Sequence, residues 1–263
     1  MSPERIDIII PTYNGARTLD GTLASLAAQV TPADRVHVVL NGCVDDSEAV
    51  ARRGLERIRA AGSDGDVVIS LETGRCAALT TGDARAEGHR LYLDQDVRLG
   101  AGGLELVRAA FRHGAVFVCG EAIWRTPSWP VLQAMRAWNR LPYVRAAGVT
   151  AGMFGVSSTG RTRWLGWPTA LPDDKWARLH FSPAERRRIA GLYYAVEAPD
   201  SFAGLIAARR RYRSYNVALS SGAPEMLADD VPRRRGLTAF SLNPLNMPGS
   251  GLLALAEILA RRG

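Results

Sequence analysis

Short β-branched apolar runs alternate with amphipathic segments over the first 120 residues of this 263-residue chain, and this alternation restricts the fold most strongly. The apolar runs predict buried strands. Helical spacing of the apolar residues between them predicts helices. The expected strands are 5–11, 36–40, 67–71, 91–93 and 115–119, and the expected helices are 18–28, 46–60, 75–85 and one ending near Arg112. This order predicts an α/β fold with a doubly wound, mostly parallel sheet, helices on both faces, and a ligand site at the carboxyl ends of the strands.

The alternation ends near residue 120. Beyond it, the sequence predicts a more helical region with helices at 128–141, 182–195, 200–215 and 252–262, and a loop at 164–178 that is rich in Trp, Pro and Asp. A chain of this length is large enough for one substantial α/β domain with an appended part.

Composition favours an ordinary globular protein, because 47% of the residues are hydrophobic and 22% are charged. No stretch of 18 apolar residues occurs, so no transmembrane helix is expected. The N-terminus does not resemble a secretory signal. The three cysteines are scattered, which fits a reducing cytoplasm better than a disulfide or zinc framework. We therefore expect a cytoplasmic protein.

The net charge of +7 lies entirely in the second part of the chain. Residues 1–150 carry 17 basic and 17 acidic groups, whereas residues 151–263 carry 16 basic and 9 acidic groups. This asymmetry suggests contact with phosphates, with an anionic acceptor or with the inner face of an anionic membrane, the last as a peripheral contact.

Polar side chains follow the predicted strands where each strand ends. Asp94, Gln95 and Asp96 come directly after the fourth strand. Because side chains two residues apart on an extended segment face the same way, both carboxylates can face one hard cation. Few protein ligands leave positions open for phosphate oxygens, as Mg²⁺ prefers. The alternative is a simple turn, since Asp is a common turn residue.

The residues after the other strands contribute an aromatic ring, amides and a positively charged side chain. Together with the carboxylates, these groups could bind the base, the ribose and the diphosphate of a nucleotide. These segments resemble family 2 glycosyltransferases, which are inverting enzymes with the GT-A fold. The resemblance covers roughly residues 5–215 and rests on five segments in the same order: 6–29 with Ile-Ile-Ile-Pro-Thr-Tyr-Asn-Gly, 38–46, 74–80, 93–96, and 155–176 with the acidic pair Asp173-Asp174. It implies a nucleotide-sugar-binding α/β half at 1–120 and an acceptor-binding and C-terminal helical part of the same GT-A domain at 121–263.

The resemblance also implies a role for each matching position. Asp94 and Asp96 would hold Mn²⁺ or Mg²⁺, and Trp176 and Arg211 would contact the acceptor or the diphosphate. The residues expected to bind the nucleotide-sugar are Pro11, Thr12, Tyr13, Asn14, Asn41, Asp45, Arg75, Asp94 and Gln95. A UDP-sugar is the expected donor. However, Leu40 stands where many members have an acid that reads uracil, so the identity of the base stays open. Thr80 stands where Asn is usual, so the contact at that position is expected to differ or to be lost.

Transfer to an acceptor hydroxyl requires a carboxylate that removes its proton. Asp174 is the expected base, and Asp173 is the second candidate. The alternative is that both acids serve only to cap a helix, since Asp caps helices well.

His180 is either a further metal ligand or, as is more usual for a lone histidine, a structural residue. Trp164, Trp167 and Trp176 are expected to form a stacking wall for a sugar or an apolar acceptor.

The basic run 209–213 loosely resembles the Gln-x-x-Arg-Trp element of processive family members, but the Gln and Trp are absent, so a single transfer is expected. A solvated basic face is the alternative. The clusters 186–188 and 233–235 are expected on the surface. The last helix is expected to pack on the core rather than on a membrane interface.

The sequence therefore predicts a metal-dependent, inverting hexosyltransferase-type enzyme that moves a sugar from a nucleoside-diphosphate donor to an acceptor hydroxyl by single displacement. One rival is a nucleotidyltransferase, but the first strand is not followed by a Gly-rich phosphate loop. Another is a non-catalytic transferase scaffold, or a basic protein that binds membrane or nucleic acid. No nucleic-acid partner is expected, because the Arg clusters lack a recognised binding module. The sequence leaves the oligomeric state undetermined.

Overall fold

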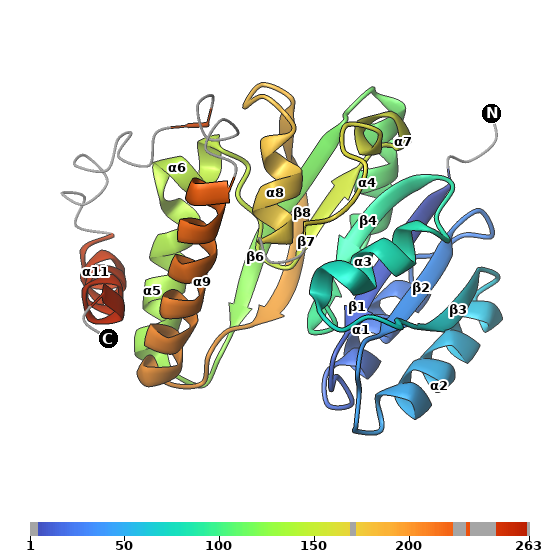
Figure 1. The fold of residues 1–263 in the computed structure, drawn as a ribbon, viewed down its shortest axis with the longest axis horizontal. Coiled ribbons are helices and arrows are strands. Elements are labelled where there is room, and N and C mark those ends of the chain that lie inside the picture. The colour runs from blue at the N-terminus through green and yellow to red at the C-terminus, as the bar shows by residue number, and fades with distance from the viewer. Residues whose placement is uncertain (1–4, 169–171, 223–229, 232–245, 262–263) are drawn as a thin grey trace.

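The computed structural model describes residues 5–168, 172–222, 230–231 and 246–261. Within them, an eight-stranded sheet has the order β3-β2-β1-β4-β7-β6-β8-β5 (Figure 1). The strands are β1 (Ile6–Thr12), β2 (Arg35–Leu40), β3 (Asp64–Ile69), β4 (His89–Leu93), β5 (Val97–Leu99), β6 (Phe117–Arg125), β7 (Met153–Val156) and β8 (Arg186–Glu197). The helices are α1 (Leu19–Ala27), α2 (Ser47–Ala60), α3 (Arg75–Asp83), α4 (Gly103–Arg112), α5 (Trp129–Arg140), α6 (Pro142–Ala146), α7 (Ser158–Arg161), α8 (Asp173–Leu179), α9 (Phe202–Gly222) and α11 (Met247–Arg261).

The first four strands in the sheet order are parallel, as the alternating sequence predicts. Strand β7 then lies antiparallel between β4 and β6, and β8 pairs parallel with β6 and antiparallel with β5. The predicted α/β architecture with a mostly parallel sheet is confirmed. The sheet is continuous across residue 120, so the predicted halves share one sheet.

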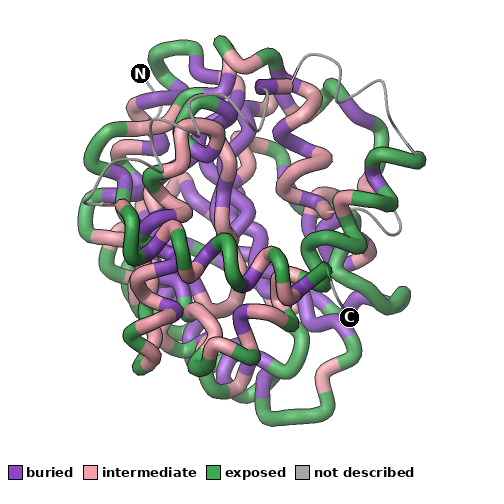
Figure 2. The backbone as a smooth tube through the Cα atoms, turned by 90° about the vertical axis from the view of Figure 1, so that its left-hand side faces the viewer, coloured by how far each residue is buried: buried purple, intermediate pink, exposed green. Residues whose placement is uncertain are grey.

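Both faces of the sheet are covered, which explains why β1 and β2 are buried along nearly their whole length and carry mainly apolar side chains. Ile6, Ile8 and Ile10 point to the face that α1, α2 and α4 cover. Ile9 points to the opposite face and packs with residues of α3 and α8. Figure 2 shows the buried residues along the interior of the molecule, with exposed residues on its outer turns.

A third apolar cluster lies beyond β6, where α5, α9 and α11 gather at the left-hand end of Figure 1. Val131 and Ala134 of α5 meet Leu205 of α9 and Leu253 and Ala256 of α11 there. The last helix therefore packs on the core, as the sequence predicts. Among the described helices, none combines the length and the hydrophobicity needed to cross a membrane.

The helix predicted at 182–195 is wrong, because this segment is mostly the long strand β8 between β6 and β5. The predicted surface position of 186–188 is also wrong for two of its three arginines. Arg186 is buried and bonds Asp230 (2.6 Å), and Arg188 donates to the carbonyl oxygen of Gly120 (2.6 Å). Successive strand residues face opposite sides, so Arg187 is exposed. The cluster 233–235 lies outside the described residues.

A buried histidine joins the first three strands at the end of the sheet opposite the predicted site. His37 of β2 bonds Asp7 of β1 through Nε2 (3.1 Å) and Asp66 of β3 through Nδ1 (2.7 Å). Burial lowers the pKa of His37, but the hydrogen bonds with Asp66 and Asp7 outweigh it, and the pKa is raised from its usual 6.5. The protonated ring therefore suits its folded surroundings.

We expect the free energy of unfolding to fall as the pH rises above 6.5, the usual pKa of histidine. A pKa that is raised in the folded state gives stabilisation that is present below the unfolded pKa and is lost as the pH passes the folded pKa. Urea denaturation at several pH values measures this. At pH 6, His37→Gln should lower the free energy of unfolding by about 1–3 kcal/mol. It should also remove the decrease of the free energy of unfolding with pH that His37 causes. The exposed His113 gives the control His113→Gln; an unchanged slope in His37→Gln would contradict the assignment.

Candidate active site

The turns that follow β1 and β4 are tied together by one side chain. The amide of Gln95 accepts from the backbone N–H of Tyr13 (2.8 Å) and donates to its carbonyl oxygen (3.1 Å). Thr22 of α1 holds the same turn by donating to the carbonyl oxygen of Gln95 (2.8 Å). Tyr13 stays 64% exposed at this edge, so its ring is available to a ligand.

The turn after β2 is fixed to both of its neighbours. Asn41 donates to the carbonyl oxygen of Glu72 (2.6 Å) and accepts from the backbone N–H of Gly74 (2.7 Å), which positions the start of α3. On the other side, Asp45 accepts from the backbone N–H of Ala16 (3.0 Å). Asn41 and Asp45 thus shape the edge of the sheet, and their side chains are already engaged.

Arg75, at the start of α3, connects the end of β4 with the start of α8. Its guanidinium donates to Asp173 Oδ1 through Nε (2.8 Å) and to Asp94 Oδ1 through a terminal nitrogen. Burial lowers the pKa of Arg75, but the carboxylates of Asp173 and Asp94 raise it well above its usual value. The guanidinium is therefore a permanent cation between two carboxylates that lie 79 residues apart in the chain.

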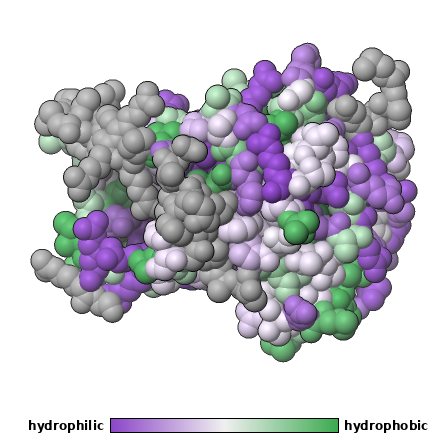
Figure 3. All heavy atoms as spheres, turned by 45° about the horizontal axis from the view of Figure 1, so that its top comes forward, coloured by the Kyte–Doolittle hydropathy of each residue, from purple (hydrophilic) through white to green (hydrophobic). Residues whose placement is uncertain are grey.

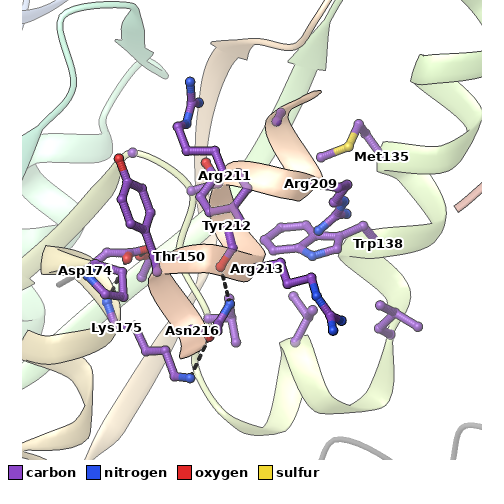
Figure 4. Close-up of a pocket in the computed structure, with 18 of the residues that line it drawn as sticks. Met135, Trp138, Thr150, Asp174, Lys175, Arg209, Arg211, Tyr212, Arg213 and Asn216 are labelled. Atoms are coloured by element: carbon purple, nitrogen blue, oxygen red, sulfur yellow. Dashed lines mark hydrogen bonds between the residues drawn. The ribbon is translucent and has the colours of Figure 1, made fainter. Parts of the chain in front are cut away.

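The second carboxylate of α8, Asp174, is held by the backbone N–H of Lys175 (2.6 Å) and by the hydroxyl of Thr150 (3.3 Å). Lys175 in turn donates to Asn216 of α9 (2.7 Å), an interaction drawn in Figure 4. Asp173 Oδ1 is engaged by Arg75, whereas its buried Oδ2 has no hydrogen-bond partner.

One cavity of about 1500 Å³ is lined by several carboxylates, and four of them, Asp94, Asp96, Asp173 and Asp174, come from the end of β4 and the start of α8. Desolvation and the charge of Asp94 raise the pKa of Asp96 to about 6. Desolvation and the charge of Asp173 likewise raise the pKa of Asp174 to about 6. Desolvation also raises the pKa of Asp94. Like charges gathered in a partly dehydrated cavity attract protons or cations, which is typical of functional sites.

The model of the family "Glycosyl transferase family 2" matches residues 7–163, which is more than half of the chain. The chain belongs to glycosyl transferase family 2. No curated protein matches the sequence of this glycosyltransferase.

Solved structures show the same fold at low sequence identity. The mannosyltransferase PcManGT from Pyrobaculum calidifontis, in complex with GDP-Man and Mn²⁺, has a TM-score of 0.68 and 18% identity, covering 100% of this chain and 87% of its own. TarS 1–349 from S. aureus, in complex with UDP-GlcNAc, has a TM-score of 0.59 and 15% identity, and the match covers 96% of this chain and 79% of TarS 1–349. Glucosyl-3-phosphoglycerate synthase from M. tuberculosis has a TM-score of 0.53 and 17% identity, and the match covers 83% of this chain and 80% of the synthase. The glycosyltransferase therefore has the predicted GT-A fold.

The acidic end of β4 fits a divalent cation that is bound mainly by its substrate. Asp94 and Asp96 line the cavity, and burial raises the pKa of each, an effect that a bound cation would oppose. No group of three or more His, Cys, Asp or Glu side chains among the described residues is arranged to hold a metal. Diphosphate oxygens and water would supply the other ligands, as is usual for Mg²⁺.

The glycosyltransferase places some predicted site residues away from the cavity. Pro11 and Thr12 are buried in β1, while Asn14 is exposed, with its side chain bonding the backbone N–H of Val44 (2.9 Å). His180 bonds the carbonyl oxygen of Trp176 (2.9 Å) and packs edge-on against its ring. Neither of these two rings is among the described residues that line the cavity, whereas Arg211 is.

The predicted wall of tryptophans is wrong for two of its members. Trp164 is buried, and Trp167 packs edge-on against Tyr92 and donates to Asp83 (2.7 Å). Both rings belong to the aromatic core beneath α8, because the loop before that helix folds inward. Trp124 and Trp138 line the cavity instead.

Thr150 and Gly152 are site residues that the sequence did not identify. Thr150 bonds Asp174, and the carbonyl oxygen of Gly152 accepts from the backbone N–H of Asp94 (2.8 Å). Gly152 has φ +80°, and a Cβ there would lie 2.9 Å from Asp94 Oδ2. The only signal in the sequence is the run of small residues at 148–156.

Gly152→Ala should displace the Asp94 carboxylate and weaken the binding of nucleoside diphosphate with Mn²⁺ at least tenfold, measured by calorimetry. The left-handed backbone adds a stability cost of about 1–2 kcal/mol. Gly102→Ala is the matched control, because Gly102 has φ +72° with nothing within 4 Å of its Cβ position. Equal affinities in the two variants would show that Gly152 does not position Asp94.

Proposed function

We propose that the glycosyltransferase is a metal-dependent, inverting enzyme that moves a sugar from a nucleoside-diphosphate donor to an acceptor hydroxyl in one displacement. The observation that supports this most is the shared cavity. The end of β4 and the start of α8 bring two pairs of carboxylates to it, and Arg75 lies between them. One pair suits the diphosphate and its cation, and the other suits the acceptor.

Asp96 and Asp94 would hold Mn²⁺ or Mg²⁺ on the donor side. A bound divalent cation neutralises the charge that develops on a leaving diphosphate. Tyr13 offers an exposed ring to the base, and Gln95 keeps it in place through the backbone. Leu40 is buried and has no polar group to read a base, so the donor's base has to be found by assay.

Asp174 is the proposed general base. The hydroxyl oxygen of the acceptor forms the new bond to the anomeric carbon while the bond to the diphosphate breaks. The electron pair leaves with the diphosphate, and the hydroxyl proton passes to the carboxylate. A base works best when its pKa lies near the working pH, and the pKa of Asp174 is about 6. Asp173 is the alternative, since its buried Oδ2 has no partner.

The structural relatives support the donor class. One of them binds GDP-Man with Mn²⁺, and another binds UDP-GlcNAc. We extend a nucleotide-sugar donor and a divalent cation to this chain on that basis. Hydrolysis of a panel of UDP- and GDP-sugars with Mn²⁺ would identify the donor, and a complete lack of binding and hydrolysis would favour a non-catalytic scaffold.

Asp96→Asn and Asp174→Asn should each lower the transfer rate by about 10²–10⁴-fold while the fold is kept. Asp96→Asn should also weaken Mn²⁺-dependent donor binding, whereas Asp174→Asn should leave it intact. Asp200→Asn, at an exposed position, is the control. Full activity in Asp174→Asn combined with its loss in Asp173→Asn would transfer the role of base to Asp173.

The value of kcat/KM should fall as the pH drops below about 6. Both Asp96 and Asp174 have pKa values raised to about 6, and each must be ionised to act. Protonation of either one removes activity, so the decline should be steeper than that of a single group. Circular dichroism at each pH checks that the fold is intact. Constant kcat/KM down to pH 5 would contradict both roles.

A further inference from the structure

The cavity that holds the four carboxylates extends well beyond them, into the space between α5, α9 and α11. Its far part is lined by apolar side chains, among them Met135 and Trp138 of α5, Leu205 of α9 and Leu253 of α11. Figure 4 shows Met135 and Trp138 on the side opposite Asp174. At about 1500 Å³, the whole cavity exceeds the usual 300–1,000 Å³ of a ligand pocket, so it has room for more than two sugars.

Arginines of α9 lie between the carboxylates and the apolar part. Arg209, Arg211 and Arg213 all line the cavity, and Figure 4 shows Arg211 between Asp174 and Trp138, with Arg209 and Arg213 beside Trp138. Arg209 pairs with Glu257 of α11 (3.3 Å). Arg211 and Arg213 have no carboxylate partner within the part of the chain that the structure describes, so their charge is available to an anion.

Three chemistries therefore follow one another along the cavity: a base for a hydroxyl, two unpaired guanidinium groups, and an apolar lining. A guanidinium binds phosphate well because its N–H groups match the phosphate oxygens. A molecule with a hydroxyl-bearing head, a phosphate and a hydrocarbon chain, in that order, is complementary to all three parts.

We propose that the acceptor is a lipid-linked sugar, in which a phosphate or diphosphate joins the sugar head to a long hydrocarbon chain. The sugar hydroxyl lies at Asp174, the phosphate lies at Arg211 and Arg213, and the chain enters the groove between α5, α9 and α11. The assignment of the hydroxyl rests on the proposed function. Where grey residues do not cover it, the left-hand end of Figure 3 shows hydrophilic and hydrophobic residues side by side.

Binding of alkyl phosphates to the full chain tests the phosphate and chain subsites without knowledge of the sugar. Calorimetry with butyl, hexyl and octyl phosphate, each below its micelle concentration, should show affinity that rises up to about threefold to fourfold for each added methylene. Octyl phosphate should bind at least tenfold more tightly than octyl glucoside, which has the chain but no charge. Equal affinities of butyl and octyl phosphate, or of octyl phosphate and octyl glucoside, would overturn the proposal.

Paired variants locate the two subsites. Ala254 of α11 is exposed to the cavity, so Ala254→Trp should narrow the groove and abolish the dependence on chain length. Leu255→Trp is its control, because Leu255 is 45% exposed and does not line the cavity. Arg213→Gln should weaken octyl phosphate binding about tenfold, whereas Arg210→Gln, at an exposed position of α9 that does not line the cavity, should not. Equal effects within either pair would show adsorption at the surface and overturn the proposal.

Donor hydrolysis in the same preparation separates the two claims. If a nucleotide-sugar is hydrolysed with Mn²⁺ but octyl phosphate binds no better than butyl phosphate, only the acceptor assignment fails. If alkyl phosphates bind as expected and no nucleotide-sugar binds or reacts, the transfer reaction fails while the amphiphile site stands.

Discussion

The guanidinium of Arg75 is the interaction on which the arrangement of the site depends. It joins Asp94 at the end of β4 to Asp173 at the start of α8, and both ion pairs lie inside the cavity. Four carboxylates in one partly dehydrated space would otherwise repel each other. This single cation does not neutralise all four: burial and a neighbouring carboxylate raise the pKa values of Asp96 and Asp174 to about 6. This deficit of positive charge prepares the site for a divalent cation on one side and for a proton on the other.

Part of the positive surplus in the second part of the chain has a structural explanation among the described residues. Arg178 and Arg186 are buried and share the carboxylate of Asp230, and Arg188 is bonded to backbone carbonyl oxygens. Those bonds fasten β8 and α8 to the sheet. Among the described residues of this part, the further arginines that line the cavity are Arg209, Arg211 and Arg213 of α9 and Arg261 of α11. Charge counted along the sequence therefore overstates the charge offered to an anionic partner.

Much of the fold could be predicted from the sequence because local pattern and tertiary position agree there. The β-branched run of β1 is buried on both faces, and the acids after β4 lie at the sheet edge that the alternation of strands and helices indicates. Strand β8 was mistaken for a helix because its arginines resemble a solvated surface. Their burial depends on Asp230, which is 44 residues from Arg186 in the chain. Thr150 and Gly152 could not be found either, because they reach the site only through the antiparallel insertion of β7 beside β4.

Anomalous scattering from crystals of the glycosyltransferase grown with Mn²⁺ and a nucleoside diphosphate tests the central claim most directly. We expect a manganese peak about 2.0–2.3 Å from a carboxylate oxygen of Asp96, with diphosphate oxygens completing its coordination and Asp94 in contact with the metal or the ribose. A nucleotide bound at this edge of the sheet without manganese at Asp96, or manganese bound elsewhere in the cavity, would contradict the assignment of the acidic end of β4.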